Sequence, residues 1–406
     1  MNKEVLKCLK CKNAKCTIAC PIATPVAEVM TLYQEHRQKE AAKMLFENNP
    51  FAYVCSLVCN YEKQCYGNCI LNYKNVPVKF YEIEEELSKT YLEELSLTVT
   101  ASKDAKVAII GAGPAGITAA IRLARLGYQI TIFDQFAEIG GILRYGIPEE
   151  RLPKASLKHY VRILKELKVK FVSNCKIGKD LTFEELKKKY DAIAVTIGAW
   201  IPKPIGIKGA NEKIVINAIE YLKNPNDYQL GAKTIVIGAG NVAMDSAYTA
   251  SMQGVDTSIY YRKTAKQMPA SEKEVAIVVN SGVKFEFLNV PAEIVKDGIY
   301  FDKGKVIEVD GKYQTKILPN TRHFVKCDSV IVAISQQCDI DFLKQANLET
   351  NNYNTVIVTD DFKTNDSQVF AAGDVVRGPD TVVAAVNQAS KMADAIADYL
   401  TELKKL

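Results

Sequence analysis

The sequence predicts an α/β protein with two Rossmann-like nucleotide-binding domains, preceded by an α-helical domain. A β-branched strand, a glycine-rich turn and an amphipathic helix follow one another from residue 106, and the same unit recurs from residue 234. The chain before residue 106 has a different pattern, because it is helical and holds eight of the eleven cysteines. A length of 406 residues also exceeds one ordinary domain, so two or three domains are expected.

The composition is that of an ordinary globular protein without a strong charge. Hydrophobic residues make up 48% of the chain, and the net charge of +5 is too small to indicate a nucleic-acid partner. No uninterrupted apolar stretch approaches the length of a membrane span, and the opening MNKEVLKCLK lacks the apolar core of a secretory signal. We therefore expect a cytoplasmic protein without a membrane partner.

The domains are expected to divide the chain into four segments. Residues 1–100 would form the helical domain, with VAEVMTLYQEHRQKEAAKMLFENN and YEIEEELSKTYLEEL as helices. Residues 101–200 and 325–406 would form the first nucleotide-binding domain, and residues 201–324 the second. Pro202 and Pro204 mark the crossing between them. The chain would close with a strand, a loop and a long helix in VFAAGDVVRGPDTVVAAVNQASKMADAIADYL.

The first glycine-rich turn has the spacing and context of a dinucleotide cradle. Its three glycines follow the strand VAII and open a helix, which allows a tight turn, the approach of a pyrophosphate, and close helix–strand packing. The helix N-terminus offers free N–H groups to the phosphates, and Asp134 ends the next strand, where it can accept hydrogen bonds from ribose hydroxyls. A turn without a ligand is disfavoured. FAD or NAD is expected to contact Gly111, Gly113, Pro114, Ala115, Gly116 and Asp134.

The second turn repeats this context in GAGNVA but ends its second strand differently. The sequence reads YYRK where the first unit has Asp134. Arg262 and Lys263 would attract a 2′-phosphate that a carboxylate repels, so the pattern favours NADPH over NADH. The alternative is a basic pair that is only a solvated strand end. The residues expected to contact this nucleotide are Gly238, Gly240, Asn241, Val242, Ala243, Arg262 and Lys263.

Two cradles indicate two nucleotides, and the useful pairing is a flavin with a nicotinamide. Hydride passes directly between the two rings, so we expect no catalytic acid or base. Gly373 and Asp374 end an apolar strand, where a carboxylate can meet the ribityl chain of a flavin. The next helix would aim its N-terminus, near Thr381 and Val382, at the flavin ring. The histidines are dispersed and expected to be incidental: His36, His159 and His323.

Eight cysteines fall in two runs near the N-terminus. The runs have the spacings C-x2-C-x4-C-x3-C-P and C-x3-C-x5-C-x3-C. Zinc ribbons favour C-x2-C pairs with longer spacers, whereas a close run that ends in Cys-Pro is typical of ferredoxin-type cluster ligation. Disulfides are rare in the cytoplasm. Spacing alone therefore ranks iron–sulfur clusters first, zinc second and disulfides last. The three remaining cysteines are expected to be small buried residues: Cys175, Cys327 and Cys338.

The flavin prediction strengthens the case for iron–sulfur clusters. A reduced flavin can release electrons one at a time, and such clusters accept them one at a time. Zinc has no redox chemistry and would do nothing beside a flavin.

Together the motifs resemble one family of FAD, iron–sulfur and NAD(P)H oxidoreductases. It comprises the small (β) subunit of NADPH-dependent glutamate synthase and the N-terminal half of dihydropyrimidine dehydrogenase. The resemblance is closest to the flavin subunit of the bacterial two-subunit dihydropyrimidine dehydrogenase and covers essentially the whole chain. The motifs that carry it are the eight cysteines, GAGPAG, GGILRYGIPEERLPK, GAGNVAMD, MPASEKE and VFAAGDVVRGPDTVVAAV.

The resemblance implies two [4Fe-4S] clusters and leaves Cys55 unligated. The second cluster would take a Gln or Glu as its fourth ligand. Aligning the apolar positions of VPVKFYEIEEEL places Glu84 there, with Glu85 as the alternative because Tyr81 stands where the family has glycine. The implied sets are Cys8, Cys11, Cys16 and Cys69 for one cluster, and Cys20, Cys59, Cys65 and Glu84 for the other.

The resemblance also implies further nucleotide contacts. They are Val58, Gly141 and Arg151 for FAD, and Ala333, Ile334 and Ser335 for NADPH. Asn241 replaces the acidic residue that is usual in the GAGD motif. NADH remains the alternative nucleotide, although Arg262 and Lys263 match the NADPH-using relatives better.

We therefore expect an oxidoreductase subunit that passes electrons from NADPH through FAD and the clusters to a partner. The partner would be a subunit of the glutamate synthase or dihydropyrimidine dehydrogenase type, or a ferredoxin, and the flow could also run from reduced ferredoxin to NADP. A thioredoxin-reductase-like enzyme would need a C-x-x-C, but only single cysteines follow residue 69. The third alternative is a zinc-stapled interaction protein on a degenerate reductase fold.

Overall fold

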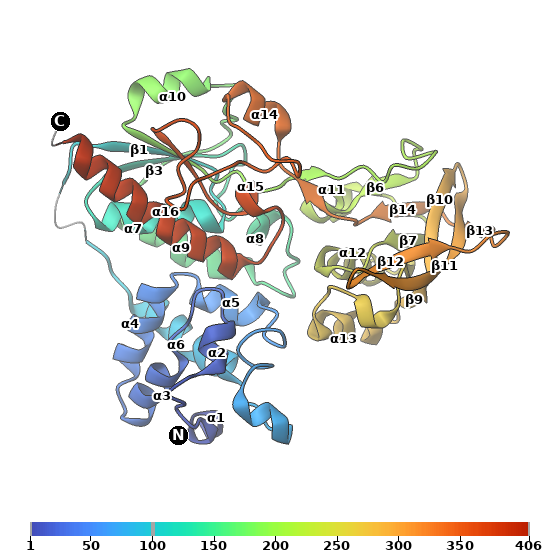
Figure 1. The fold of residues 1–406 in the computed structure, drawn as a ribbon, viewed down its shortest axis with the longest axis horizontal. Coiled ribbons are helices and arrows are strands. Elements are labelled where there is room, and N and C mark those ends of the chain that lie inside the picture. The colour runs from blue at the N-terminus through green and yellow to red at the C-terminus, as the bar shows by residue number, and fades with distance from the viewer. Residues whose placement is uncertain (1, 99–101, 405–406) are drawn as a thin grey trace. The chain divides into compact units, whose positions relative to one another are not determined.

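The computed structural model describes residues 2–98 and 102–404, and the chain folds into two compact units (Figure 1). The second unit holds Tyr145–Pro148 and Trp200–Gln336, and the first unit holds the rest. The α/β class with two Rossmann-like sheets and a helical N-terminal domain is confirmed. The expected boundary between residues 100 and 101 lies outside the described residues.

The N-terminal helices of the first unit enclose their own hydrophobic core. Val29 and Met30 of one helix meet Leu45 of the next and Ile83 of the last, and all four side chains are buried. The left-handed φ of His36 (+59°) separates two helices within the long segment that was expected to be helical. The bounds are α1 Lys3–Lys7, α2 Lys15–Ala19, α3 Val26–Gln34, α4 Gln38–Asn48, α5 Ala52–Val58, η1 Ile70–Lys74 and α6 Phe80–Glu94.

The first unit continues into a parallel five-stranded sheet of order β16-β4-β1-β2-β3. Its central strands KVAII, QITIF and AIAV are buried on both faces, which suits a sheet covered by helices on either side. The strands are β1 Lys106–Ile110, β2 Gln129–Phe133, β3 Lys170–Val172, β4 Ala192–Val195 and β16 Val369–Ala371.

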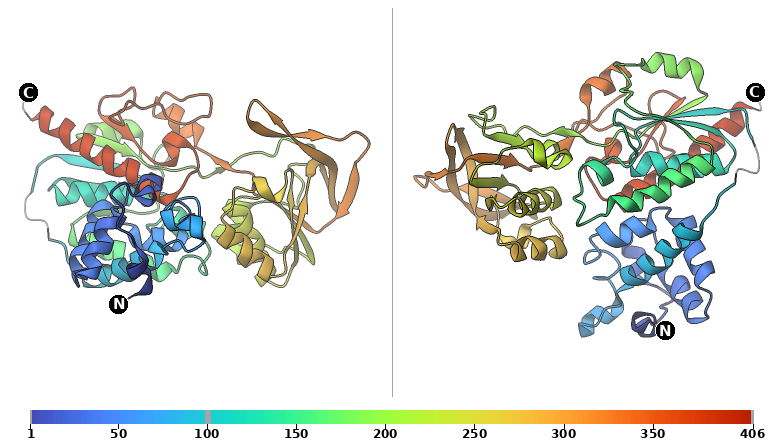
Figure 2. Two further views of the ribbon diagram at one scale, coloured as in Figure 1. Left: turned by 60° about the horizontal axis from the view of Figure 1, so that its bottom comes forward. Right: turned by 180° about the vertical axis from the view of Figure 1, so that it is seen from behind.

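Helices cover both faces of this sheet. On one face, Phe183 of α10 and Phe342 of α14 pack against Ile110 and Val195. On the other, α16 lies along α7, as Figures 1 and 2 show, and Arg122 pairs with Asp394 between them. The helices are α7 Pro114–Arg125, α8 Ile142–Tyr145, η2 Lys154–Leu157, α9 Lys158–Glu166, α10 Phe183–Lys189, α14 Ile340–Gln345, α15 Asp374–Arg377 and α16 Val382–Leu403.

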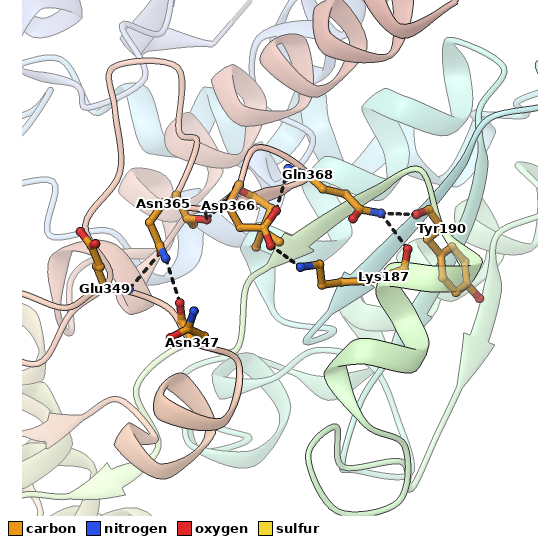
Figure 3. A network of polar contacts seen from close by, with 9 residues as sticks. Lys187, Tyr190, Asn347, Glu349, Asn365, Asp366 and Gln368 are labelled. Carbon is orange, nitrogen blue, oxygen red and sulfur yellow. Dashed lines mark hydrogen bonds and ion pairs between the residues drawn. The ribbon is translucent and has the colours of Figure 1, made fainter.

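A polar network fixes the segment that leads into β16 (Figure 3). The side-chain amide of Gln368 donates to the carbonyl oxygens of Lys187 and Tyr190 at 3.0 and 2.5 Å. Lys187 also pairs with Asp366. The network ties the start of β16 to the end of α10. Since β16 pairs in parallel with β4 and β4 with β1, the residues that follow these three strands leave the same edge of the sheet.

The second unit contains a parallel sheet of order β6-β14-β7-β8-β9. The sheet strands are β6 Val215–Asn217, β7 Lys233–Ile237, β8 Asp256–Tyr261, β9 Lys284–Phe287 and β14 Ser329–Val332. The helices of this part of the chain are α11 Ala218–Lys223, η3 Pro225–Asp227, α12 Asn241–Met252, η4 Ala265–Gln267 and α13 Glu272–Asn280. The short strands β5 Ile201–Pro202 and β15 Gln336–Gln337 pair with each other. Helices α11, α12 and α13 pack on one face. The unit extends to Gln336 rather than residue 324, because β14 pairs with β6 and β7 in the middle of this sheet.

An antiparallel sheet packs on the other face of the parallel one (Figure 2). The ring of Phe301 stacks on Tyr260 of β8, with centroids 4.4 Å apart. This sheet is formed by β10 Asn289–Val295, β11 Gly298–Val309, β12 Lys312–Ile317 and β13 His323–Lys326. Among the described residues, no helix is both long enough and apolar enough to cross a membrane.

Candidate functional site

The first glycine turn forms a close-packed cradle at the carboxyl end of β1. Gly111 has φ +105°, and a Cβ there would lie 2.5 Å from the carbonyl oxygen of Thr196. A Cβ on Gly116 would lie 1.9 Å from the carbonyl oxygen of Gly111, so both positions require glycine. Gly113 is different, because its nearest neighbour would be the Cα of Gly141 at 4.0 Å. The open side at Gly113 is where a pyrophosphate can approach the backbone.

Asp134 holds the cradle in shape from the end of β2. Its two carboxylate oxygens accept hydrogen bonds from the backbone N–H groups of Ala112 (2.6 Å) and Phe136 (2.8 Å). Burial raises the pKa of Asp134, and these two bonds oppose the rise. The structure therefore gives Asp134 a supporting role in the turn, in addition to the ribose contact that the sequence predicts.

The C-terminal segment joins this cradle although it is far away in sequence. Gly373 has φ +85°, and a Cβ there would lie 3.1 Å from the Cβ of Ala115 in the first turn of α7. Burial raises the pKa of Asp374 to about 7. Thr381 caps α16 by accepting a hydrogen bond from the N–H of Ala384, and Val382 is the first residue of that helix. The predicted flavin-binding segments therefore converge within the first unit.

The remaining residues predicted to contact FAD lie in the same unit at different depths. Gly141 has φ +53° and faces Gly113, since a Cβ on it would lie 2.8 Å from the Gly113 Cα. Val58 is buried at the end of α5. Arg151 is partly buried in the loop before η2.

The second cradle repeats the geometry of the first in the second unit. Gly238 has φ +139°, and a Cβ there would lie 2.2 Å from the carbonyl oxygen of Ala333. A Cβ on Gly240 would meet nothing closer than Pro269 at 3.8 Å, so this side of the turn is open. Asn241 accepts a hydrogen bond from the N–H of Ser271, which fastens the segment MPASEKE to the cradle. Val242 and Ala243 continue into the first turn of α12.

Basic and strained residues lie near this second cradle. Arg262 and Lys263 directly follow β8, and the Arg262 side chain is exposed. Ala333 donates its N–H to the carbonyl oxygen of Ile237, which places the turn of Ala333, Ile334 and Ser335 beside the cradle. Ser335 has φ +124°, a conformation that costs a non-glycine residue on the order of 1–3 kcal/mol and is found most often at functional sites.

A cavity in the helical domain brings the two cysteine runs together. It encloses about 360 Å³ between atoms, part of which is open to solvent. Cys20 comes from the first run, Cys59 and Cys65 come from the second, and Glu84 comes from α6. Sequence reasoning missed several other residues of its wall: Thr24, Asn49, Tyr61, Gln64, Phe80, Tyr81 and Val383.

The chemistry of this cavity suits a cation. Burial raises the pKa of Glu84 to about 8 and also raises the pKa of the Cys20 and Cys65 thiols. A hydrogen bond with Cys55 and burial raise the pKa of Cys59. Buried anions are costly unless a positive charge neutralises them, and a metal deprotonates the thiols that it binds. Three thiols and one carboxyl around one cavity therefore fit a metal group.

A second group of thiols lies outside this cavity. Burial raises the pKa of Cys8, and the nearby thiols of Cys11 and Cys69 add to the rise. Burial raises the pKa of Cys16 to about 11, again with contributions from Cys69 and Cys8. The backbone N–H of Val78 donates to the Cys69 sulfur at 3.5 Å. Thiols from both runs therefore lie near one another.

The spacing of these groups differs from that of a mononuclear site. Within residues 2–98 and 102–404, no three His, Cys, Asp or Glu side chains stand close enough to hold a single metal ion. The thiols of a four-iron cluster each bind a different iron atom, so they need not meet at one point.

The two candidates for the non-cysteine ligand lie differently on α6. Glu84 is buried and lines the cavity, whereas Glu85 is partly exposed and contributes to the pKa of Tyr53. Cys55 also lines the cavity, and its sulfur accepts a hydrogen bond from the Asn49 amide at 3.4 Å.

The single cysteines are mostly as expected. Cys327 and Cys338 are buried. Cys175 is only partly buried, because it lies in the loop after β3 rather than in the sheet.

Comparison with known proteins identifies the family. Residues 105–389 match the family described as pyridine nucleotide-disulphide oxidoreductase. This chain belongs to that family. Residues 1–95 match a domain described as dihydropyrimidine dehydrogenase domain II, 4Fe-4S cluster, so the chain begins with an iron–sulfur domain. These matches support an NAD(P)H-dependent oxidoreductase that uses FAD and at least one [4Fe-4S] cluster.

Named relatives match along almost the whole chain. The glutamate synthase [NADPH] small chain of Halomonas elongata is 31% identical, over 97% of this chain and 89% of its own length. The NAD-dependent dihydropyrimidine dehydrogenase subunit PreT of Escherichia coli O157:H7 is 32% identical, over 98% of this chain and 94% of its own length. The resemblance found in the sequence motifs is thus confirmed.

Solved structures show the same fold. Mycobacterium tuberculosis FprA in complex with NADPH has a TM-score of 0.65 at 17% identity, over 75% of this chain and 86% of its own. Thioredoxin reductase of T. acidophilum has a TM-score of 0.55 at 20% identity, over 73% of this chain and 98% of its own.

Proposed function

We propose that this chain is the electron-input subunit of a larger enzyme: it oxidises NADPH and delivers single electrons to a partner protein through two [4Fe-4S] clusters. The observation that carries the proposal is the cavity lined by Cys20, Cys59, Cys65 and Glu84, because Val383 of α16 lines it too. Val383 lies in the first turn of the helix whose N-terminus is predicted to face the flavin ring. One helix end therefore serves both the flavin site and the cluster cavity, which favours electron transfer between them.

Each of the two sets of cysteines would hold one cluster. Cys20, Cys59, Cys65 and Glu84 would bind the cluster nearer the flavin. The other cluster would be bound by Cys8, Cys11, Cys16 and Cys69. Bound FAD would supply a hydride acceptor that can release single electrons, and the clusters would supply one-electron sites. The protein's own task is to bind and orient these groups and to exclude water.

The nucleotides would divide between the two units. FAD would occupy the cradle at Gly113, where Asp134 supports the turn and the segment from Gly373 closes over α7. NADPH would occupy the cradle at Gly240, with its 2′-phosphate held by Arg262 and Lys263.

A thiol-disulfide activity is disfavoured although the fold allows it. Beyond residue 69 the cysteines are single, and Cys327 and Cys338 are buried. Such an activity needs two neighbouring thiols that a substrate can reach.

Replacing Arg262 with aspartate is expected to raise the KM for NADPH about tenfold to a hundredfold, because a carboxylate would repel the 2′-phosphate, a cost of roughly 1.4–2.8 kcal/mol. The KM for NADH should change little. Initial rates with both nucleotides and a small artificial acceptor measure the effect. Lys296→Asp, an equal charge change at the exposed turn between β10 and β11, is the control. Equal changes for NADPH and NADH would count against the assignment.

Replacing Glu84 with alanine is expected to remove one cluster, about four iron atoms per chain. Glu84→Gln should retain it, because an amide oxygen can replace the carboxylate as a ligand. Glu85→Ala should also retain it. Iron content and the electron paramagnetic resonance signal of the reduced protein distinguish the variants. Loss of iron from Glu85→Ala and not from Glu84→Ala would assign the ligand to Glu85.

A further inference from the structure

Exposed apolar side chains of the helical domain gather around one group of cysteines. Within residues 2–98, every large hydrophobic side chain that is exposed follows or precedes Cys8, Cys16 or Cys69 within seven positions. Elsewhere in these residues the large hydrophobic side chains are buried or partly buried. We call the exposed set the apolar collar: Leu6, Leu9, Ile18, Ile70, Tyr73 and Val76.

Contacts within the helical domain bring the collar segments together. The N–H of Lys79 donates to the Glu4 carboxylate at 2.9 Å, which joins α1 to the segment that follows Val76. Cys8, Cys16 and Cys69 pack against the same hydrophobic core. Leu9 and Ile70 are sequence neighbours of two of these cysteines. After Tyr73 the chain returns to the group, since the N–H of Val78 donates to the Cys69 sulfur. In Figure 1, α1 and α2, which carry or flank the first three collar residues, belong to the same helical part of the chain.

The extent of exposure is unusual for side chains of this kind. Ile18 is 75% exposed, Tyr73 71% and Leu6 63%. Single exposed apolar residues need no explanation, but a contiguous exposed apolar group usually marks a protein interface. Burial of apolar side chains is the main favourable contribution to most protein association, and tyrosine is among the residue types that contribute most at an interface centre.

Lysines lie among the N-terminal residues of the collar. Residues 3–15 contain five lysines and one acidic residue, Glu4, which already accepts a hydrogen bond from Lys7. Lys12 and Lys15 are exposed. An apolar centre with a positive rim is complementary to a partner with an apolar centre and an acidic rim. A second copy of this chain fits poorly, because the two lysine rims would repel each other.

We propose that the apolar collar is the docking surface for an acidic one-electron carrier protein. The carrier exchanges electrons with the chain through the cluster that Cys8, Cys11, Cys16 and Cys69 would bind. This inference rests on the proposed function, because that function supplies the electrons. Oxidation of one NADPH to NADP⁺ releases one proton and two electrons, and these reduce two carrier molecules by one electron each. No bond to the carrier forms or breaks.

The test uses the anaerobic full-length holoprotein and a plant-type [2Fe-2S] ferredoxin as the acidic carrier. Stopped-flow absorbance measures the second-order rate at which prereduced ferredoxin transfers electrons to the oxidised chain, at several salt concentrations. The variants are Leu9→Ser, Ile18→Ser, Tyr73→Ser and the double variant Lys12→Glu/Lys15→Glu. Tyr353→Ser and the double variant Lys179→Glu/Lys344→Glu are matched controls, because these side chains are exposed and lie outside the helical domain.

Each serine variant is expected to slow the exchange at least about fivefold, the effect of losing a central interface residue worth roughly 1 kcal/mol. The lysine variant should slow it further at low salt and flatten the salt dependence. The controls should exchange electrons at the wild-type rate. Iron and flavin contents should be unchanged in all variants, which separates docking from cofactor loss.

Three results would overturn the proposal. They are wild-type rates in the collar variants, equal slowing in the controls, and no electron exchange between ferredoxin and intact wild-type protein. Sedimentation that shows a dimer lost in the collar variants would assign the surface to a second copy instead. Failure of NADPH to reduce the iron in the wild-type protein would contradict the proposed function, and it is measured separately without ferredoxin.

Discussion

Replacing Gly113 with alanine is expected to give a folded protein that binds FAD about a hundredfold more weakly, a loss on the order of 3 kcal/mol. The added Cβ meets no protein atom closer than the Gly141 Cα at 4.0 Å, and Gly113 has an ordinary φ of −81°. The fold therefore accommodates the methyl group. The same methyl group would occupy the open side of the turn, where the pyrophosphate must approach the backbone.

Flavin released on denaturation measures the loss, and circular dichroism checks the fold. Gly116→Ala is the informative contrast, because its Cβ would lie 1.9 Å from the carbonyl oxygen of Gly111 and should disrupt the fold itself. Gly240→Ala makes the same change in the second cradle and should weaken NADPH binding while FAD is retained. Normal FAD binding by the Gly113 variant would show that the flavin lies elsewhere.

Replacing Cys59 with serine is expected to remove the cluster nearer the flavin and to slow electron delivery to a protein carrier by at least about a hundredfold, because the chain of one-electron sites is broken. Reduction of a small artificial acceptor by NADPH through FAD should persist. Iron analysis should show about half the wild-type content, four of roughly eight atoms.

Cys55→Ser is a closely matched control for this variant. Cys55 lies one helical turn before Cys59, lines the same cavity and is buried. Since we assign it no iron, its serine variant should keep both clusters and the wild-type rate of electron delivery. If Cys55→Ser lost a cluster and Cys59→Ser did not, the ligand assignment would have to be exchanged between the two cysteines.

Local patterns explain why the cradles were predictable from the sequence. Gly111 and Gly238, the first glycines after β1 and β7, have the positive φ and the close backbone contacts that only glycine tolerates, and such constraints appear directly as residue identity. Glu84 was proposed as a ligand from the family resemblance, by aligning the apolar positions of VPVKFYEIEEEL, with Glu85 as the alternative. In the structure, Ile83 and Leu87 face the core of the helical domain, which fixes the rotation of α6 and turns Glu84 rather than Glu85 inward.

Features that depend on distant contacts were not predictable in this way. Val383 lines the cluster cavity, yet more than 300 residues separate it from Cys59 and Cys65, and no local pattern links them. The end of the second unit was placed too early for a similar reason. The strand SVIV of β14 is equally apolar in either unit, and only its pairing with β6 and β7 assigns it. The family resemblance implied Ser335 as an NADPH contact, but its positive φ was not predictable, because serine seldom adopts that conformation.

The account depends most on iron that NADPH can reduce. The direct measurement is the iron and acid-labile sulfide content of anaerobically purified protein with FAD bound, followed by NADPH titration monitored by absorbance and electron paramagnetic resonance. We expect about eight iron atoms per chain, four in each of two clusters, and a reduced-cluster signal that appears with NADPH. Protein that retains FAD but contains no iron, or iron that NADPH leaves oxidised while the flavin is reduced, would contradict the account.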